Sequence, residues 1–381
     1  MHGRKKSDLP QTEDEKRAIQ AKIKNYQKVI SAVRLKRASG DLGDEYKALL
    51  GKVLRLHPDY YSMWNYRKET VLKERSYYKP HGREGSEFDG EKAQDDRCIG
   101  VQIGPAAICE EDFRRVFEEE LALSVDCIKR NPKSYPAWHH HKWALEKGLK
   151  YLGGSSALAK QLSLCGDLLE LDGRNFHCWA HRMWLVQQMG FPAEEDFEFT
   201  TRKINQNFSN YSAFHYRSKL LPRMITEAGR DRWELLDQEL ELVHDAMFTE
   251  PADQSVWWYH HFLLTWAEEG SVKDEVEQYE EVLRSERDIL RELIELEGRC
   301  KWAELALLLV THRLADSLAT PRPGEAGDGD PSSEITQLRA SASDMASRLR
   351  ELDPSHRHFY DVLELGLTTR GRGPPLQDDK T

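Results

Sequence analysis

The segment NPKSYPAWHHHKW, residues 131–143, combines a lysine, a tyrosine and three consecutive histidines around a tryptophan. The histidines, residues 139–141, are the side chains that most suggest a metal site. Consecutive helical residues lie about 100° apart, so three of them cannot all ligate one ion. His177 and His181 have the four-residue spacing of helical zinc ligands, but no carboxylate or thiol completes a set. The sequence therefore predicts no metal site in these segments.

The residues ahead of the tryptophan suit a different chemistry, the binding of an anion. The start of a helix offers free backbone N–H groups and the positive end of its dipole, both of which favour phosphate. Cations, phenols, amides and an imidazole precede the aromatic residue in several similar segments, at Lys133, Tyr135, Arg174, Asn175, His177, Asn210 and Tyr211. All of these except Arg174 form what we call the predicted diphosphate edge. Asparagine also caps helices, so a purely structural role for these residues stays open.

These segments belong to a repeat. The pattern occurs as HPDYYSMWNYR (57–67), NPKSYPAWHHHK (131–142), DGRNFHCWAHR (172–182), NFSNYSAFHYR (207–217) and EPADQSVWWYHH (250–261). Its anchor aromatics are Trp64, Trp138, Trp179, Phe214 and Trp257. After one longer first gap they lie 35 to 43 residues apart, a period typical of stacked helical hairpins. Weaker echoes follow at 301–309 and 353–363.

The stretches between the anchors indicate helices. Residues 113–130 and 158–172 carry apolar side chains at helical spacing and end in turn-forming residues before the next anchor segment. We therefore predict an all-α fold, a right-handed α/α superhelix (a solenoid) of about seven helical hairpins over residues 14–367. The sequence further predicts a mobile N-terminal segment (1–13), a long loop insertion (76–107), a second loop (319–334) and a disordered tail (368–381).

A basic residue three positions after each anchor has a structural interpretation. Arg67, Arg182 and Arg217 hold this position, and each is expected to pair with an acidic residue in the next hairpin. His141 and His260 replace arginine in the other two segments, which weakens the expectation of a continuous ionic lattice.

Composition excludes several function classes. The net charge of −10 disfavours a general nucleic-acid binder, and we expect no nucleic-acid partner. No apolar run approaches the roughly 20 residues of a membrane-spanning helix, and the first residues do not resemble a signal peptide. Six cysteines without paired spacing favour a reduced, cytoplasmic protein.

The segments NPKSYPAWHH, RNFHCW and NFSNYS follow one another in an order that resembles the α subunits of protein prenyltransferases, and the resemblance covers residues 45–310 well. Within that family the chain is most similar to the Rab geranylgeranyltransferase (type II) α subunit in a compact form. The α subunit shared by farnesyltransferase and geranylgeranyltransferase type I is an alternative. A non-catalytic helical-repeat scaffold is a further alternative, although the irregular, Trp-anchored spacing differs from a tetratricopeptide array.

The resemblance implies a heterodimer whose β subunit holds the catalytic zinc, while this chain holds no cofactor. The implied reaction transfers geranylgeranyl from geranylgeranyl diphosphate to C-terminal cysteines of Rab GTPases, which a Rab escort protein presents. Lys133 would be the catalytic residue that reaches the diphosphate, with Tyr135, Asn175 and His177 beside it. Phe176 stands where farnesyltransferases have a tyrosine. In Rab-type relatives His2 could reach the zinc of the β subunit.

Overall fold

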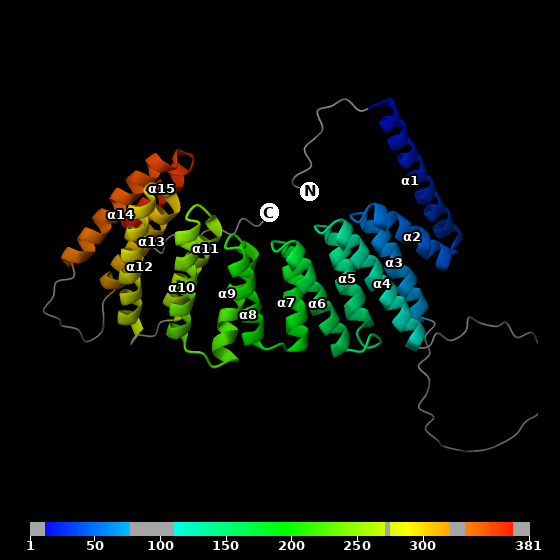
Figure 1. The fold of residues 1–381 in the computed structure, drawn as a ribbon, viewed down its shortest axis with the longest axis horizontal. Coiled ribbons are helices and arrows are strands. Elements are labelled where there is room, and N and C mark those ends of the chain that lie inside the picture. Colours follow the sequence, from blue (N-terminus) through cyan, green and yellow to red (C-terminus); the bar gives the residue numbers. More distant parts are fainter. Residues whose placement is uncertain (1–11, 77–109, 271–274, 321–331, 369–381) are drawn as a thin grey trace, which may run out of the picture. The chain divides into compact units, whose positions relative to one another are not determined.

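The computed structural model describes residues 12–76, 110–270, 275–320 and 332–368 (Figure 1). Every regular element in these ranges is a helix. The predicted loop 76–107 lies outside them except for Ser76, and so do residues 1–11 and the tail after Thr368. The chain divides into two compact units, residues 1–190 and 191–381.

The described residues of the first unit form one long helix and three helical hairpins. The long helix is α1 (Glu13–Ser39), and the hairpins are α2 (Asp44–Leu56) with α3 (Tyr61–Ser76), α4 (Glu110–Arg130) with α5 (Tyr135–Gly148), and α6 (Ser155–Leu171) with α7 (Phe176–Met189). The second helices α3, α5 and α7 contact one another in sequence. Helix α5 packs tightly on α4 at Gly148. A Cβ atom at this position would lie 2.6 Å from the Cγ atom of Phe117, so the packing requires glycine.

Four hairpins are described in the second unit. They are α8 (Ala193–Gln206) with α9 (Tyr211–Thr226), α10 (Arg232–Thr249) with α11 (Gln254–Gly270), α12 (Val276–Glu297) with α13 (Lys301–Ala319), and α14 (Ser332–Leu352) with α15 (Arg357–Thr368), the last joined by the 3-10 turn η2 (Pro354–His356). The described residues thus form seven hairpins, as the repeat predicted. Helix α1 begins at Glu13, inside the expected mobile segment, and α14 begins at Ser332, inside the expected second loop.

Each anchor aromatic is buried, and each anchor tryptophan also holds the turn of its own hairpin. The four anchor tryptophans donate their indole N–H to the carbonyl of the residue six positions earlier, at 2.7 to 2.9 Å: Trp64 to Pro58, Trp138 to Pro132, Trp179 to Gly173 and Trp257 to Pro251. Phe214 is fully buried but has no N–H to donate. The ring therefore ties the turn to the second helix while its apolar face fills the core, and both contributions hold the hairpin closed.

Buried charge joins one hairpin to the next. Arg67 on α3 donates to both carboxylate oxygens of Glu120 on α4, and the Nε2 atom of His140 lies 2.8 Å from the same carboxylate. The three side chains are at most 5% exposed. Burial raises the pKa of Glu120, but Arg67 and His140 outweigh it and hold that pKa below its ordinary value.

The same arrangement recurs in the second unit. Arg217 on α9 binds both carboxylate oxygens of Glu239 on α10 at 2.6 and 2.7 Å, and the hydroxyl of Tyr259 donates to Glu239 at 2.5 Å. The predicted pairing of Arg67 and Arg217 with an acid of the next hairpin is therefore confirmed. Arg182 is buried as well.

The two histidines at the arginine position keep the contact with the next hairpin. The Nε2 atom of His141 lies 3.0 Å from the Oε1 atom of Gln161 on α6. The Nε2 atom of His260 lies 2.9 Å from Glu286 on α12, which also binds His244. Where the arginine is missing, the contact survives with a different chemistry. We call these contacts, ionic or neutral, the inter-hairpin clusters.

Replacing Glu120 with alanine should lower the free energy of unfolding by about 3–5 kcal/mol, because it leaves the buried Arg67 cation without its partner. Urea titration of the purified chain measures the loss. Glu119→Ala is the matched control, since Glu119 is the preceding residue of α4 and is exposed. Equal losses in the two variants would contradict a structural role for the cluster.

Stability should also depend on pH through His141. Burial holds the pKa of His141 at about 4, against an ordinary 6.5. The unfolded ring binds a proton below about pH 6.5 and the folded ring only near pH 4, so this stability is present above pH 6.5 and is lost as pH falls toward 4. The loss at pH 5 is about 2 kcal/mol.

The variant His141→Gln should therefore reduce the difference in unfolding free energy between pH 7 and pH 5, measured by urea titration at each pH. His358→Gln, at an exposed histidine of α15, controls for the removal of a histidine as such. An unaltered pH dependence in His141→Gln would refute the assignment.

Candidate functional site

Two helix starts lie side by side in the first unit, at the N-termini of α5 and α7. The side chain of Ser134 caps α5 and that of Asn175 caps α7. Asn175 also donates its Nδ2–H to the carbonyl of Pro132, at 3.0 Å, in the turn before α5. One amide therefore caps its own helix and binds the neighbouring hairpin, so these two helix starts lie side by side.

Aromatic side chains of the two helices meet above these caps. The rings of Tyr135 and His177 lie 4.2 Å apart, edge to face, and Phe176 contacts both. Tyr135 is 67% exposed and His177 is 9% exposed. Lys133 and Arg174 are also exposed. The site is an outer layer of cations and aromatic rings over one nearly buried imidazole.

His177 is the chemically distinctive residue of this layer. Burial lowers the pKa of its imidazole, partly offset by a hydrogen bond between the ring and the backbone of Lys133. The Nε2 atom is buried and has no hydrogen-bond partner within the described part of the chain. A neutral ring therefore presents a lone pair at Nε2, and a protonated ring would present a donor. An anion bound beside Lys133 and the two helix starts would favour the protonated form.

The residues of the predicted diphosphate edge belong to both units. Lys133, Tyr135, Asn175 and His177 come together in the first unit. Asn210 and Tyr211 belong to the second unit, where the Asn210 side chain caps α9 and Tyr211 contacts Trp258. Asn175 and Asn210 are buried caps, so their observed bonds are structural ones. A role for any of the six residues in binding diphosphate remains a prediction.

The sequence did not identify the carbonyl of Pro132, which accepts both the Trp138 indole and the Asn175 amide. A backbone acceptor leaves no signal in residue type, although the proline one position before Lys133 marks the turn.

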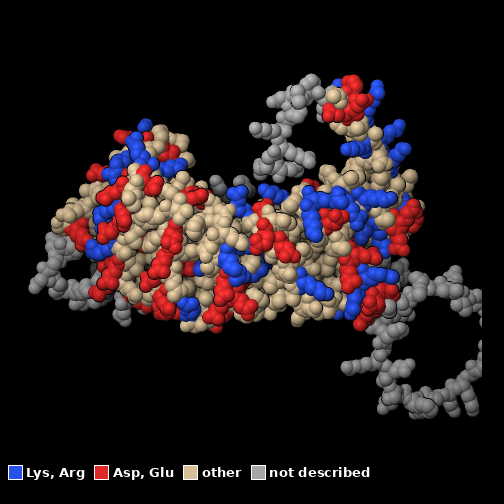
Figure 2. Space-filling model, in the orientation of Figure 1, with Lys and Arg blue, Asp and Glu red and all other residues tan. Residues whose placement is uncertain are grey.

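The described part of the chain has neither a cluster of metal ligands nor a membrane-spanning helix. No group of three or more histidine, cysteine, aspartate or glutamate side chains there could hold a metal ion. His2, the suggested zinc ligand, lies outside the described residues. None of the described helices is long and apolar enough to cross a bilayer. On the face shown in Figure 2, acidic and basic side chains are interspersed.

Stacked helical hairpins with anchored turns define the class, an α-helical repeat protein of the solenoid type. The family described as "Protein prenyltransferase alpha subunit repeat" matches residues 45–74, 117–148, 158–189, 193–224 and 236–267. Each match falls on one hairpin, from α2/α3 to α10/α11.

Proteins that are similar to this chain over longer stretches carry descriptions that agree with this family. The chain is 30% identical over 345 residues to the "Geranylgeranyl transferase type-2 subunit alpha" of Dictyostelium discoideum, covering 90% of this chain and 92% of the relative. The pig protein of the same description is 34% identical over 271 residues, covering 69% of this chain and 42% of the relative. The chain therefore spans less than half the length of that mammalian relative. It belongs to the protein prenyltransferase α-subunit family, in the type-2 geranylgeranyl transferase group.

A solved structure shows the same fold. The match is the structure described as "Candida albicans protein geranylgeranyltransferase-I complexed with GGPP", with a TM-score of 0.56 and 14% identity, over 90% of this chain and 91% of that one. At this identity the likeness establishes the hairpin solenoid and nothing about the ligand.

The contact between Tyr135 and His177 makes a prediction about the imidazole. Tyr135→Ala should raise the pKa of His177 toward its ordinary 6.5, because the change removes part of the burial that lowers it. Tyr135→Phe keeps the ring and should leave that pKa as it is in the parent chain. Histidine NMR titration measures both variants, and the same pKa in Ala and Phe variants would show that the ring does not shield His177.

Proposed function

We propose that this chain is the α subunit of a heterodimeric geranylgeranyltransferase type II. The enzyme would transfer geranylgeranyl from geranylgeranyl diphosphate to C-terminal cysteine thiols of Rab GTPases, presented by a Rab escort protein. Catalysis would require the β subunit. The observation that carries the proposal is the convergence of Lys133, Tyr135 and His177 at two adjacent helix starts, within repeats of this family.

The chemistry explains why such a site is useful. The bond between the isoprenoid carbon and the diphosphate oxygen breaks, a carbon–sulfur bond forms, and the thiol proton is released. A zinc ion in the β subunit would lower the pKa of the substrate thiol and so favour the thiolate nucleophile. Negative charge develops on the departing diphosphate, where fixed positive groups stabilise it most effectively.

The residues of this chain would act on that leaving group. Lys133 is exposed and can reach an anion held by a partner subunit. The helix dipoles of α5 and α7 add partial positive charge behind it. His177 can donate from Nε2 once protonated, and the Tyr135 hydroxyl is a further donor. Phe176 provides an exposed apolar surface in the same place.

Several other observations fit this assignment. Cys127, Cys165, Cys178 and Cys300 are free thiols, in keeping with the proposed cytoplasmic location. The shared α subunit of farnesyltransferase and geranylgeranyltransferase type I is the alternative. A substrate panel separates the two, because a Rab with paired C-terminal cysteines and a peptide ending in CaaX report different enzymes. Modification of the peptide alone would overturn the type II assignment.

Lys133→Ala should slow single-turnover prenyl transfer by the reconstituted heterodimer about tenfold or more. Its effect on the Kd for geranylgeranyl diphosphate should be smaller, because the interaction strengthens as charge develops on the leaving group. Rapid-quench kinetics and equilibrium binding give the two quantities.

The matched control is Lys129→Ala, which removes an exposed lysine four residues earlier, in the last turn of α4. Transfer should then proceed at the parent rate. If Lys133→Ala also left the single-turnover rate unchanged, Lys133 would not be catalytic.

A further inference from the structure

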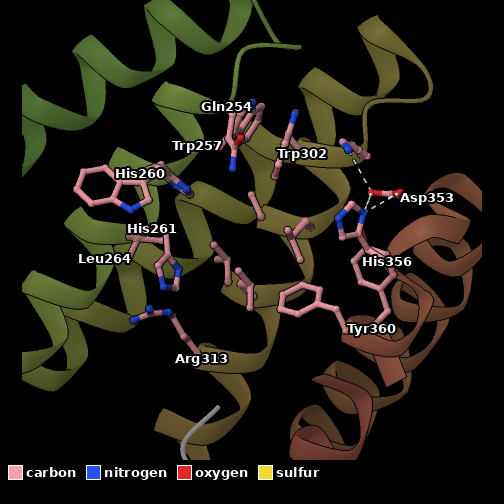
Figure 3. Close-up of a pocket in the computed structure, with 17 residues that line it drawn as sticks. Gln254, Trp257, His260, His261, Leu264, Trp302, Arg313, Asp353, His356 and Tyr360 are labelled. Atoms are coloured by element: carbon pink, nitrogen blue, oxygen red, sulfur yellow. Dashed lines mark hydrogen bonds and ion pairs between the residues drawn. The ribbon is translucent and has the colours of Figure 1, made fainter. Parts of the chain in front are cut away.

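A cavity of about 420 Å³ lies in the second unit, between α11, α13 and the segment that leads into α15 (Figure 3). Five aromatic rings line it: Trp257, Trp258, Trp302, Phe359 and Tyr360. Its volume lies within the range of ligand sites in proteins, which are mostly apolar with a few polar groups. Most of its lining falls after residue 267, where the matched repeats end.

The lining of the cavity follows one side of α13. Its lining residues on that helix run from Lys301 to Arg313, with Leu305 and Leu309 between them. At 1.5 Å per residue this stretch is about 18 Å long. Leu305 and Leu309 are only partly buried, so the middle of the α13 surface that lines the cavity, which we call the cavity floor, is apolar and accessible.

The charged groups at the ends of the cavity are already paired within the protein. The Nζ atom of Lys301 lies 3.1 Å from Asp353, and the Nδ1 atom of His356 lies 3.0 Å from the same carboxylate. Arg313 binds Glu268 at 2.6 Å. Figure 3 places Asp353 and His356 on one side and Arg313 on the other. An ionic ligand would have to compete with these partners, so the cavity favours a neutral one.

The ring of His261 is one of the polar groups in the lining. His260 is bound to Glu286, but the ring of the next residue, His261, has no hydrogen-bond partner among the described residues. Burial, together with Arg313 and His260, lowers the pKa of His261 to about 4, so the ring is neutral at pH 7. A neutral imidazole can accept from or donate to a neutral polar group, such as an alcohol or an amide.

We propose that this cavity binds a neutral isoprenoid chain, with the apolar tail along α13 and the polar end at His261. The inference rests on the proposed function, which transfers such a chain from its diphosphate to a cysteine sulfur and so leaves it as a neutral thioether. A site without unpaired cations would hold the chain of the product in preference to the charged substrate. The binding step itself makes and breaks no covalent bond.

The segments that form the cavity support a role distinct from packing. Residues 301–309 and 353–363 are the weak echoes of the repeat, and they contribute Lys301, Trp302, Asp353 and Tyr360 to the lining. Trp302 is partly exposed, whereas the anchor tryptophans are at most 6% exposed. An accessible indole beside apolar residues is suited to contact a ligand.

Binding of geranylgeraniol to the purified full chain tests the proposal, with tryptophan fluorescence and calorimetry as readouts. The neutral alcohol should bind at least tenfold more tightly than geranylgeranyl diphosphate. Leu305→Arg places a cation on the cavity floor and should weaken alcohol binding at least tenfold. Leu296→Arg makes the same change at an exposed leucine of α12 and should leave binding unchanged.

Leu309→Phe serves as a second variant, because it fills the cavity with an apolar ring and should weaken binding without adding charge. Circular dichroism verifies the fold of each variant. Equal binding by the Leu305→Arg and parent chains would overturn the proposal. The proposal would also be overturned if the parent chain did not bind the alcohol and Leu305→Arg failed to assemble with the β subunit. The cavity would then be a protein-docking site.

These outcomes are separable from the proposed function. A heterodimer that transfers geranylgeranyl while its α subunit fails to bind geranylgeraniol would overturn the cavity proposal alone. A chain that binds the alcohol in this cavity but supports no transfer with a β subunit would overturn the enzyme assignment.

Discussion

The packing of the hairpins depends on side chains that are buried and polar. A carboxylate inside a helical stack is stable only where it is paired and hydrogen-bonded. Glu120 meets this condition through Arg67 of the preceding hairpin and His140 of its own, and Glu239 does so through Arg217 and Tyr259. Each such contact restricts how far one hairpin can slide on the next. Apolar packing alone would fix that register less sharply.

The register in turn positions the candidate site. With α5 and α7 locked side by side, Asn175 reaches the carbonyl of Pro132 and the ring of Tyr135 covers His177. The inter-hairpin clusters tolerate variation even between these two hairpins, since His141 of α5 meets Gln161 of α6 as a neutral pair. A rigid pair of helix starts with exposed cations is a suitable platform for an anion that another subunit holds.

Much of the fold was predictable because each repeat of the sequence pattern corresponds to one helical hairpin. The five anchor aromatics together with the two weaker echoes indicated about seven hairpins, and asparagines such as Asn175 were recognisable as helix caps. The neutral His141–Gln161 contact was hidden, because a glutamine carries no charge signal. The cavity was hidden as well, since residues far apart in the sequence line it and they follow the repeat only weakly. In the candidate site, residue type suggested Lys133 and His177. The sequence did not show that Asn175 both caps α7 and binds the carbonyl of Pro132.

The central claim is that this edge completes an active site held by a second chain. Native mass spectrometry of the complex that co-purifies with the tagged chain tests it most directly. We predict a one-to-one heterodimer with a prenyltransferase β subunit that carries zinc. Recovery of the chain alone, or only with proteins unrelated to prenyl transfer, would contradict the account.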